Sequence, residues 1–259
     1  METLLSKNGR LRLFLITGQS NSLGSTADPV EPGCPPPFDP LDEAIPLYWS
    51  NRSSRSGDGP AVLLGDSGGE FKSLQFQQGE GANPIFWGPE IGFGRSLAAA
   101  GIDNFAIIKA SRGGGGNGFW VKDGEDNHMY RHVMETVKGA LAALPQQREV
   151  VIEALLYVQG ESDSDEQAVV SGERLQLLAA NLRADLPYAA NMRVIIGGIA
   201  APGERRDIVR REQAALAARD KSFTYIDTLD LQPLLYDQLH FNKTAKLELG
   251  RRMAAAVTS

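Results

Sequence analysis

The sequence predicts an α/β fold in which helices cover both faces of a five-stranded parallel sheet. Two observations support this prediction: short apolar runs alternate with longer segments of helical period, and most of these runs are continuous. Continuous apolar runs are typical of strands that are covered on both faces. Alternation of strands with helices is typical of a parallel sheet. The chain has 259 residues, enough for one large domain, and we predict a single domain over residues 1–259.

The predicted elements follow one another along the chain as strand and helix. The expected strands cover residues 10–17, 104–110, 150–158, 192–200 and 222–227. The expected helices cover residues 89–101, 126–144, 165–186, 204–220 and 242–257. Asp165 and Asn242 are residue types that favour the start of a helix, and Gly101 is typical of the end of one.

Residues 24–88 interrupt this alternation. The segment is first Pro-rich and then rich in Gly and Ser, so we predict a long loop insertion. Long insertions of this kind form lids or binding surfaces in some proteins and only decorate the surface in others. Both roles are open for this segment.

Composition excludes several classes of partner. The net charge is −6 and no run of Lys or Arg is present, which argues against nucleic acid and anionic membrane surfaces as partners. Cys34 is the only cysteine, so an intrachain disulfide and a zinc site of paired cysteines are excluded. The sequence has no apolar segment long enough to cross a bilayer, and the N-terminus does not resemble a signal peptide. We therefore expect a cytoplasmic protein, whose oligomeric state the sequence leaves open.

Polar clusters follow four of the predicted strands. "GQSNS" comes after the first strand and "SRGGGGNGFW" (111–120) after the second. "QGESD" (159–163) follows the third strand, and "DQLH" (237–240) follows the fifth after a short loop. Ligands of parallel α/β sheets bind beyond the carboxyl ends of the strands. We therefore expect these clusters to meet at one edge of the sheet.

The residue types in these clusters favour acyl transfer. A serine hydroxyl such as that of Ser20 needs a base to remove its proton, and the imidazole of His240 is suited to that task. Asp237 lies three residues earlier and is close enough to orient the imidazole. The oxyanion of a tetrahedral intermediate needs N–H donors, for which Ser20, the glycine run and Gln159 are candidates.

The same residues also allow other interpretations. Ser20 is also a residue type that caps helices, and an Asp-x-x-His segment is more often a surface turn. Glu161 and Asp163 could form an acid/base couple or bind a divalent metal, but we favour a structural role for them beside Gln159. His128 and His132 have the spacing of helical zinc ligands but lack the glutamate of a metalloprotease helix. The run of four glycines lacks the Lys-Ser/Thr of a phosphate-binding loop.

The motifs together resemble a known family. "GQSN", "KASRGGGGNGFW", "YVQGESD" and "DQLHFN", in this order, are similar to the sequence blocks of the SGNH (GDSL-type) serine hydrolases. They most resemble the carbohydrate acetylesterase branch, which contains acetylxylan esterases and sialate O-acetylesterases, and "WGPEIGFGRSLA" (87–98) adds to this likeness. The motifs extend from residue 13 to about residue 253. The resemblance implies a flavodoxin-like three-layer α/β/α sandwich with strand order 2-1-3-4-5.

The resemblance also implies roles for individual residues. Ser20 would be the nucleophile, Asp237 the orienting acid and His240 the base. The oxyanion donors would be the N–H of Ser20, the N–H of Gly113 or Gly114, and the side-chain amide of Gln159. No metal or cofactor is expected.

The substrate implied by the resemblance is an acetylated carbohydrate. The side chains expected to line its pocket are those of Gln19, Asn21, Arg112, Trp120 and Glu161. A lipase, thioesterase or arylesterase on the same scaffold is the alternative enzyme, because fold alone does not determine substrate. A carbohydrate-binding protein without activity is the alternative that is not an enzyme.

Overall fold

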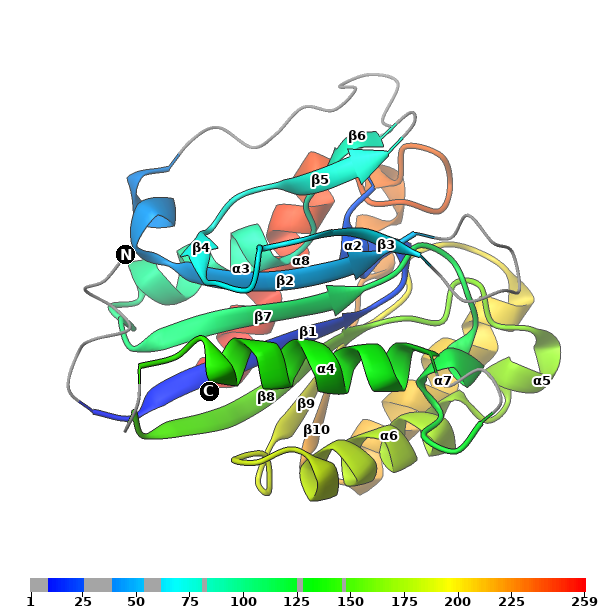
Figure 1. Ribbon diagram of the computed structural model, residues 1–259. Coiled ribbons are helices and arrows are strands. Elements are labelled where there is room, and N and C mark those ends of the chain that lie inside the picture. The colour runs from blue at the N-terminus through cyan, green and yellow to red at the C-terminus, as the bar shows by residue number, and fades with distance from the viewer. Residues whose placement is uncertain (1–8, 26–38, 54–61, 81–82, 125–127, 146–147) are drawn as a thin grey trace.

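The protein folds around a mostly parallel sheet with helices on both faces (Figure 1). The computed structural model describes residues 9–25, 39–53, 62–80, 83–124, 128–145 and 148–259. Within this part, the sheet has eight strands in the order β10-β9-β8-β1-β7-β2-β3, and β4 also pairs with β2. No helix in this part is long and apolar enough to cross a membrane.

The five predicted strands form the centre and one side of the sheet. They are β1 (Leu11–Gly18), β7 (Phe105–Ser111), β8 (Val150–Val158), β9 (Arg193–Gly197) and β10 (Phe223–Ile226). All five are parallel, and their spatial order is the predicted 2-1-3-4-5 when they are numbered along the chain. β1 lies between β7 and β8, where Leu13 packs into the core on one face and Phe14 into the core on the other. This two-sided burial explains its continuous apolar run.

The prediction of only five strands was wrong, because the segment expected to be a loop extends the sheet. β2 (Pro46–Arg52) pairs in parallel with β7, and β3 (Leu63–Asp66) and β4 (Lys72–Ser73) pair antiparallel with β2. β5 (Gln77–Glu80) and β6 (Asn83–Phe86) form a separate two-stranded sheet. The expected insertion at residues 24–88 is therefore partly regular. Its residues 26–38, which include Cys34, lie outside the described residues.

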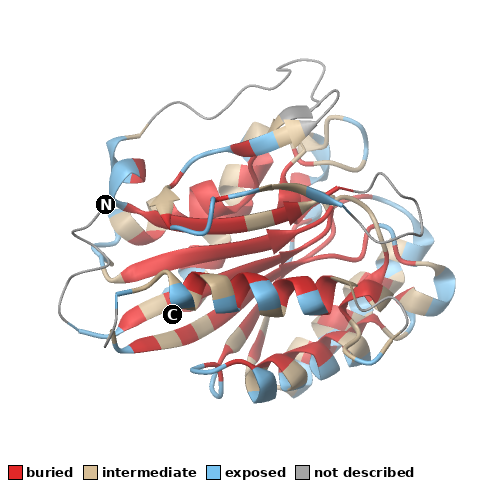
Figure 2. Cartoon of the chain, in the orientation of Figure 1, coloured by how far each residue is buried: buried red, intermediate tan, exposed pale blue. Residues whose placement is uncertain are grey.

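Helices cover the sheet on both faces. α4 (His128–Ala142), α6 (Ser171–Asp185) and α7 (Glu204–Arg219) bury side chains in one core, and α3 (Glu90–Ala99) and α8 (Lys243–Thr258) in the other. Figure 2 shows the buried strands of the sheet between partly exposed helices. As predicted, Asn242 caps its helix: its side chain accepts a hydrogen bond from the Ala245 N–H at 3.0 Å.

Several short helices lie in the connections. α2 (Ser20–Leu23) follows β1, and α5 (Asp165–Ala168) precedes α6. Ser164, not the predicted Asp165, caps α5. Three short 3-10 helices complete the described elements: η1 (Pro40–Ala44), η2 (Asn117–Trp120) and η3 (Leu229–Leu234).

Candidate active site

The first strand brings Ser20 to the carboxyl edge of the sheet. β1 ends at Gly18, which has a φ of +150° and approaches β8 so closely that a Cβ would lie 1.9 Å from the carbonyl oxygen of Val158. Only glycine fits this position. The chain then turns into α2, of which Ser20 is the first residue, and Ser20 remains partly exposed. Figure 1 shows α2 at the edge toward which the strands point.

Ser20, His240 and Asp237 form one hydrogen-bonded chain. The Nε2 atom of His240 lies 2.9 Å from the Oγ atom of Ser20, and the Nδ1 atom of His240 lies 2.6 Å from Oδ2 of Asp237. The imidazole therefore bridges the hydroxyl and the carboxylate, although 220 residues separate Ser20 from His240. The side chains of His240 and Asp237 are 20% and 41% exposed, so these hydrogen-bonded residues lie at the protein surface.

The loop that carries Asp237 and His240 is fixed by its own hydrogen bonds. Oδ1 of Asp237 accepts the backbone N–H groups of Leu239 at 3.1 Å and His240 at 2.6 Å. Gln238 between them adopts a left-handed φ of +64°, which is uncommon for a residue other than glycine. Burial alone would raise the pKa of Asp237, but the hydrogen bonds from His240 and Leu239 outweigh it and hold this pKa below its usual value.

Asn21 connects the serine segment to the histidine loop. Its side-chain oxygen accepts the N–H of Phe241 at 3.0 Å, and its amide donates to the carbonyl of Leu239 at 3.1 Å. The same amide donates to Oε1 of Glu161 at 2.6 Å. Asn21 thus holds both neighbours of His240, and it is 3% exposed. The side chain of Asn21, which the sequence predicts to line the substrate pocket, thus contacts the backbone on either side of His240.

Glu161 also lies in the interior. It is 2% exposed, and burial raises the pKa of its carboxyl group, against the hydrogen bond from Asn21. One of its carboxylate oxygens accepts that hydrogen bond, and its backbone carbonyl accepts a hydrogen bond from Arg206 at 3.1 Å. These contacts place the side chain of Glu161, which the sequence predicts to line the pocket, in the interior beside Asn21.

The other three side chains expected to contact the substrate are buried as well. Gln19 is 0% exposed, and its amide both donates to and accepts from Ser162. The indole N–H of Trp120 donates to Oγ1 of Thr17 at 3.0 Å. The guanidinium of Arg112 stacks on Phe119, with 3.9 Å between its Cζ atom and the centre of the ring. These contacts place all three side chains in the interior next to the site.

The N–H groups of the glycine run differ in their partners. The N–H of Gly113 donates to the carbonyl of Arg52 at 3.3 Å, whereas no described residue accepts a hydrogen bond from the N–H of Gly114. The N–H of Ser20, in the first turn of α2, likewise has no acceptor among the described residues. Of the two glycine candidates, Gly114 is therefore the one with an N–H that remains for a ligand.

Gln159 and Asp163 belong to a buried polar network. The amide of Gln159 donates to Oδ1 of Asp163 at 2.6 Å, and its oxygen accepts the hydroxyl of Tyr157 at 3.0 Å. Asp163 is fully buried, which raises the pKa of its carboxyl group to about 6 in spite of its hydrogen bonds to Gln159 and Asn117. The site thus contains a buried carboxylate beside the proposed amide donor.

Several residues of the site were not singled out from the sequence. Tyr236 stacks on the imidazole of His240, with 5.8 Å between ring centres. Lys109, fully buried and paired with Glu90 at 2.7 Å, donates to the carbonyl of Leu23 at the end of α2. A charged residue inside the apolar run of a strand was the only sequence signal for Lys109.

The described residues contain no group of three or more His, Cys, Asp or Glu side chains that could hold a metal ion. Nε2 of His132 lies 2.7 Å from the carbonyl oxygen of Ser50, and burial lowers the pKa of His132 to about 4, so the ring is neutral and donates this bond. Nδ1 of His128 lies 3.3 Å from Nη2 of Arg131. The contacts of Glu161 and Asp163 are likewise with protein groups.

Prolonged treatment with EDTA should therefore leave the activity of this site unchanged. The physical reason is that the four candidate ligands Glu161, Asp163, His128 and His132 are held by other groups of the protein. The rate of hydrolysis of an ester substrate, as expected from the sequence, is measured before and after chelation. A loss of activity that zinc or calcium restores would show that these residues bind a metal.

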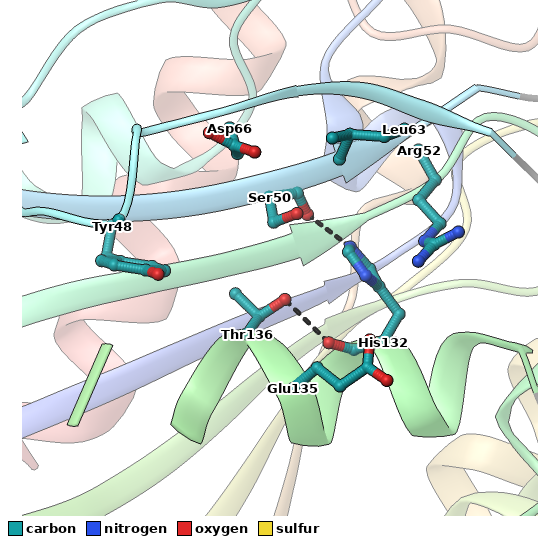
Figure 3. A pocket seen from close by; sticks show the side chains of 9 residues that line it. Tyr48, Ser50, Arg52, Leu63, Asp66, His132, Glu135 and Thr136 are labelled. Carbon is teal, nitrogen blue, oxygen red and sulfur yellow. Dashed lines mark hydrogen bonds between the residues drawn. The ribbon is translucent and has the colours of Figure 1, made fainter. Parts of the chain in front are cut away.

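A separate cavity of about 340 Å³ lies between α4 and the strands β2 and β3 (Figure 3). His132 reaches from α4 across this cavity to the carbonyl of Ser50, and Arg52 lies at its edge. Neither Ser20 nor His240 lines it. This cavity is therefore distinct from the site around Ser20.

Solved structures of known proteins resemble this fold. A protein from Arabidopsis thaliana has 22% sequence identity and a TM-score of 0.69, with 96% of this chain and 98% of that chain covered. XAC1771, a carbohydrate acetylesterase from Xanthomonas citri, has 16% identity and a TM-score of 0.61 over 94% of this chain and 55% of that chain. NanS has 14% identity and a TM-score of 0.55 over 97% of this chain and 98% of that chain. These structures show the same fold.

No curated protein matches the sequence. Residues 10–259, however, match the family described as "Carbohydrate esterase, sialic acid-specific acetylesterase". This match covers nearly the whole chain and includes the segments that carry Ser20, Gln159 and His240. The chain therefore belongs to this family of carbohydrate esterases and is a carboxylic ester hydrolase.

Proposed function

We propose that this enzyme removes acetyl groups from a carbohydrate through an acetyl-enzyme intermediate on Ser20. The observation that carries the proposal is the continuous hydrogen-bonded chain from the Ser20 hydroxyl through His240 to Asp237. A serine activated in this way attacks esters, and the family match supports an O-acetyl sugar as the substrate.

In the acylation step, Oγ of Ser20 attacks the carbonyl carbon of the acetyl group and gives its proton to Nε2 of His240. Asp237, bonded to Nδ1, holds the ring in the required tautomer and stabilises the imidazolium that forms. The bond between the carbonyl carbon and the sugar oxygen then breaks, and His240 returns the proton to that oxygen. The deacetylated sugar leaves, and the acetyl group stays on Ser20.

In the deacylation step, a water molecule attacks the acetyl-Ser20 ester. His240 takes one proton from this water and later returns it to Oγ of Ser20 as acetic acid leaves, which then loses the other proton to the solvent. The partial exposure of His240 gives water a route to the base. No group beyond Ser20, His240 and Asp237 is needed to balance these proton transfers.

The oxyanion that forms in both steps requires N–H donors. The N–H groups of Ser20 and Gly114 are suited to this task because no described residue accepts a hydrogen bond from either. Gln159 is the third donor that we propose: one hydrogen of its amide is donated to Asp163, and the second has no acceptor among the described residues.

Replacement of Gln159 tests its proposed contribution. Gln159→Ala should lower kcat by roughly 10²–10³, or about 3–4 kcal/mol, with little change in KM, since the donor acts mainly on the transition state. Gln159→Glu should be slower still, because it would place a negative charge beside the oxyanion. Steady-state kinetics at equal folded fraction is the measurement. Similar, modest rate defects in both variants, together with a lower Tm, would show that Gln159 only braces its loop.

The substrate assignment is tested by acetate release from a panel of acetylated xylooligosaccharides, acetylated sialic acids and simple acetyl sugars. We expect release from at least one class, with Ser20→Ala as the negative control. A series of p-nitrophenyl esters of increasing chain length separates the remaining possibilities. Strong preference for acetate supports the proposal, whereas preference for long chains would favour a lipase or thioesterase. Absence of turnover on every ester would favour a carbohydrate-binding protein.

A further inference from the structure

Asp163 lies between the two strand ends that supply the proposed oxyanion donors. Its Oδ1 accepts the amide of Gln159, which directly follows β8, at 2.6 Å. The same Oδ1 accepts the backbone N–H of Asn117 at 2.8 Å, and Oδ2 accepts the side-chain amide of Asn117 at 2.8 Å. Asn117 follows the glycine run after β7, so one carboxylate holds both segments together.

The hydrogen bonds of Gln159 determine the orientation of its amide. Burial raises the pKa of the Tyr157 hydroxyl well above its ordinary value, so this group stays protonated and donates to the amide oxygen of Gln159. The amide nitrogen faces Asp163, which as a carboxylate can only accept. Because one amide hydrogen is fixed on Asp163, the second points in a defined direction.

The carboxylate of Asp163 also holds the glycine run, through its hydrogen bonds from Asn117. Asn117 is the third residue after Gly114, and it is 2% exposed. Its side-chain amide also donates to the carbonyl of Gln167 at 2.9 Å, and its side-chain oxygen accepts a hydrogen bond from Arg174. The bonds from Asp163 therefore fix the end of the loop that contains the N–H of Gly114.

We propose that Asp163 is a positioning residue for the oxyanion hole, which sets the Gln159 amide and the Gly114 N–H relative to each other. The inference rests on the proposed function and deepens it. Asp163 is not itself an oxyanion donor, since a carboxylate only accepts and its two oxygens already receive three N–H donors. These charge-assisted hydrogen bonds offset part of the cost of burying the carboxylate.

Asp163→Asn is the variant that disturbs this arrangement most specifically. Asparagine has nearly the same size, but one of its two carboxamide positions carries hydrogens and cannot accept. Gln159 and Asn117 present three donors, so at least one of them must lose its partner. The substitution should therefore loosen the Gln159 amide or the Asn117 end of the glycine loop while the volume of the side chain is kept.

A double-mutant cycle between Asp163 and Gln159 tests the proposal. Asp163→Asn alone should lower kcat about 10²-fold or more with little change in KM, as the loss of an oxyanion donor does. In the Asp163→Asn background, Gln159→Ala should reduce kcat by no more than about threefold, because the donor is already displaced. Losses that multiply, or an unchanged kcat in Asp163→Asn, would overturn the proposal.

Two further variants keep this test decisive. Asp42→Asn is the matched control: Asp42 is also a buried carboxylate, paired with Arg95 at 2.6 Å, but it lies before the start of β2, at the opposite edge of the sheet. The kcat of Asp42→Asn should stay near that of the wild type.

If Asp163→Asn does not fold, Tyr157→Phe replaces it, since this variant removes only the hydrogen bond to the amide oxygen of Gln159. It should lower kcat several-fold, and the effect should vanish in the Gln159→Ala background; an unchanged kcat would count against the proposal.

Ser20→Ala, measured in the same assay, separates this inference from the proposed function. If Ser20→Ala abolishes activity but the losses at Asp163 and Gln159 multiply, the positioning role of Asp163 fails and the serine mechanism stands. If Ser20→Ala keeps its activity, the serine mechanism itself fails.

Discussion

Ser20→Ala should reduce kcat by on the order of 10⁴ or more while leaving the fold intact. The variant removes the only atom that can form the acetyl-enzyme, and His240 then has no hydroxyl to deprotonate. The fold should persist because Ser20 is partly exposed and its side chain provides no cap for α2. Acetate release and the Tm of the purified variant are the two measurements.

Ser22→Ala is the matched control for this variant. Ser22 lies in the same short helix, but it is fully buried and its hydroxyl bonds to that of Ser111 at 2.7 Å, away from His240. We expect its kcat to stay within about threefold of the wild type, since surface and core hydroxyls without a catalytic contact affect stability rather than rate. Activity near the wild type in Ser20→Ala would end the serine-esterase interpretation.

Asp237→Asn should lower kcat by roughly 10³–10⁴, the second largest effect that we expect. If its oxygen keeps the backbone N–H groups of Leu239 and His240, the asparagine turns its NH2 group toward Nδ1, where it donates instead of accepting. The neutral amide also does not stabilise the imidazolium that forms during attack. The Tm should change little, because the carboxylate is 41% exposed and an exposed ion pair contributes little to folding. Steady-state kinetics and thermal unfolding are the measurements.

Asp230→Asn provides the control for Asp237→Asn. Asp230 also lies in the connection between β10 and α8, but it pairs with Arg252 at 2.5 Å. Its replacement should leave kcat unchanged. If Asp237→Asn is as active as the wild type, another carboxylate orients His240, and Glu161, which is connected to the histidine loop through Asn21, would be the first to examine.

The centre of the fold follows from the sequence, but its edge does not. Strands such as β1 and β8 are covered on both faces, and this burial leaves a continuous apolar run that can be recognised without a structure. β2 is buried as well, but it lies between Pro-rich and Gly-rich segments whose composition indicates a loop. Its pairing with β7 is a long-range contact, and local composition carries no information on such contacts.

For the candidate site, residue types indicated which groups meet but not where each side chain points. Ser20, His240 and Asp237 lie together as expected. Asn21 and Gln19, their neighbours in the same motif, point inward and bind other loops. The difference between Gly113 and Gly114 depends on the carbonyl of Arg52, at the end of a strand that was not predicted.

The central claim, a covalent acetyl-enzyme on Ser20, is tested most directly by trapping that intermediate. The enzyme is mixed with an activated acetyl ester, quenched in acid within the first turnovers, digested and examined by mass spectrometry. We expect the mass of one acetyl group on the peptide that carries Ser20, and none in the Ser20→Ala variant treated in the same way. Acetylation of a different residue, or turnover in the wild type with no acetylated peptide at any quench time, would contradict the mechanism.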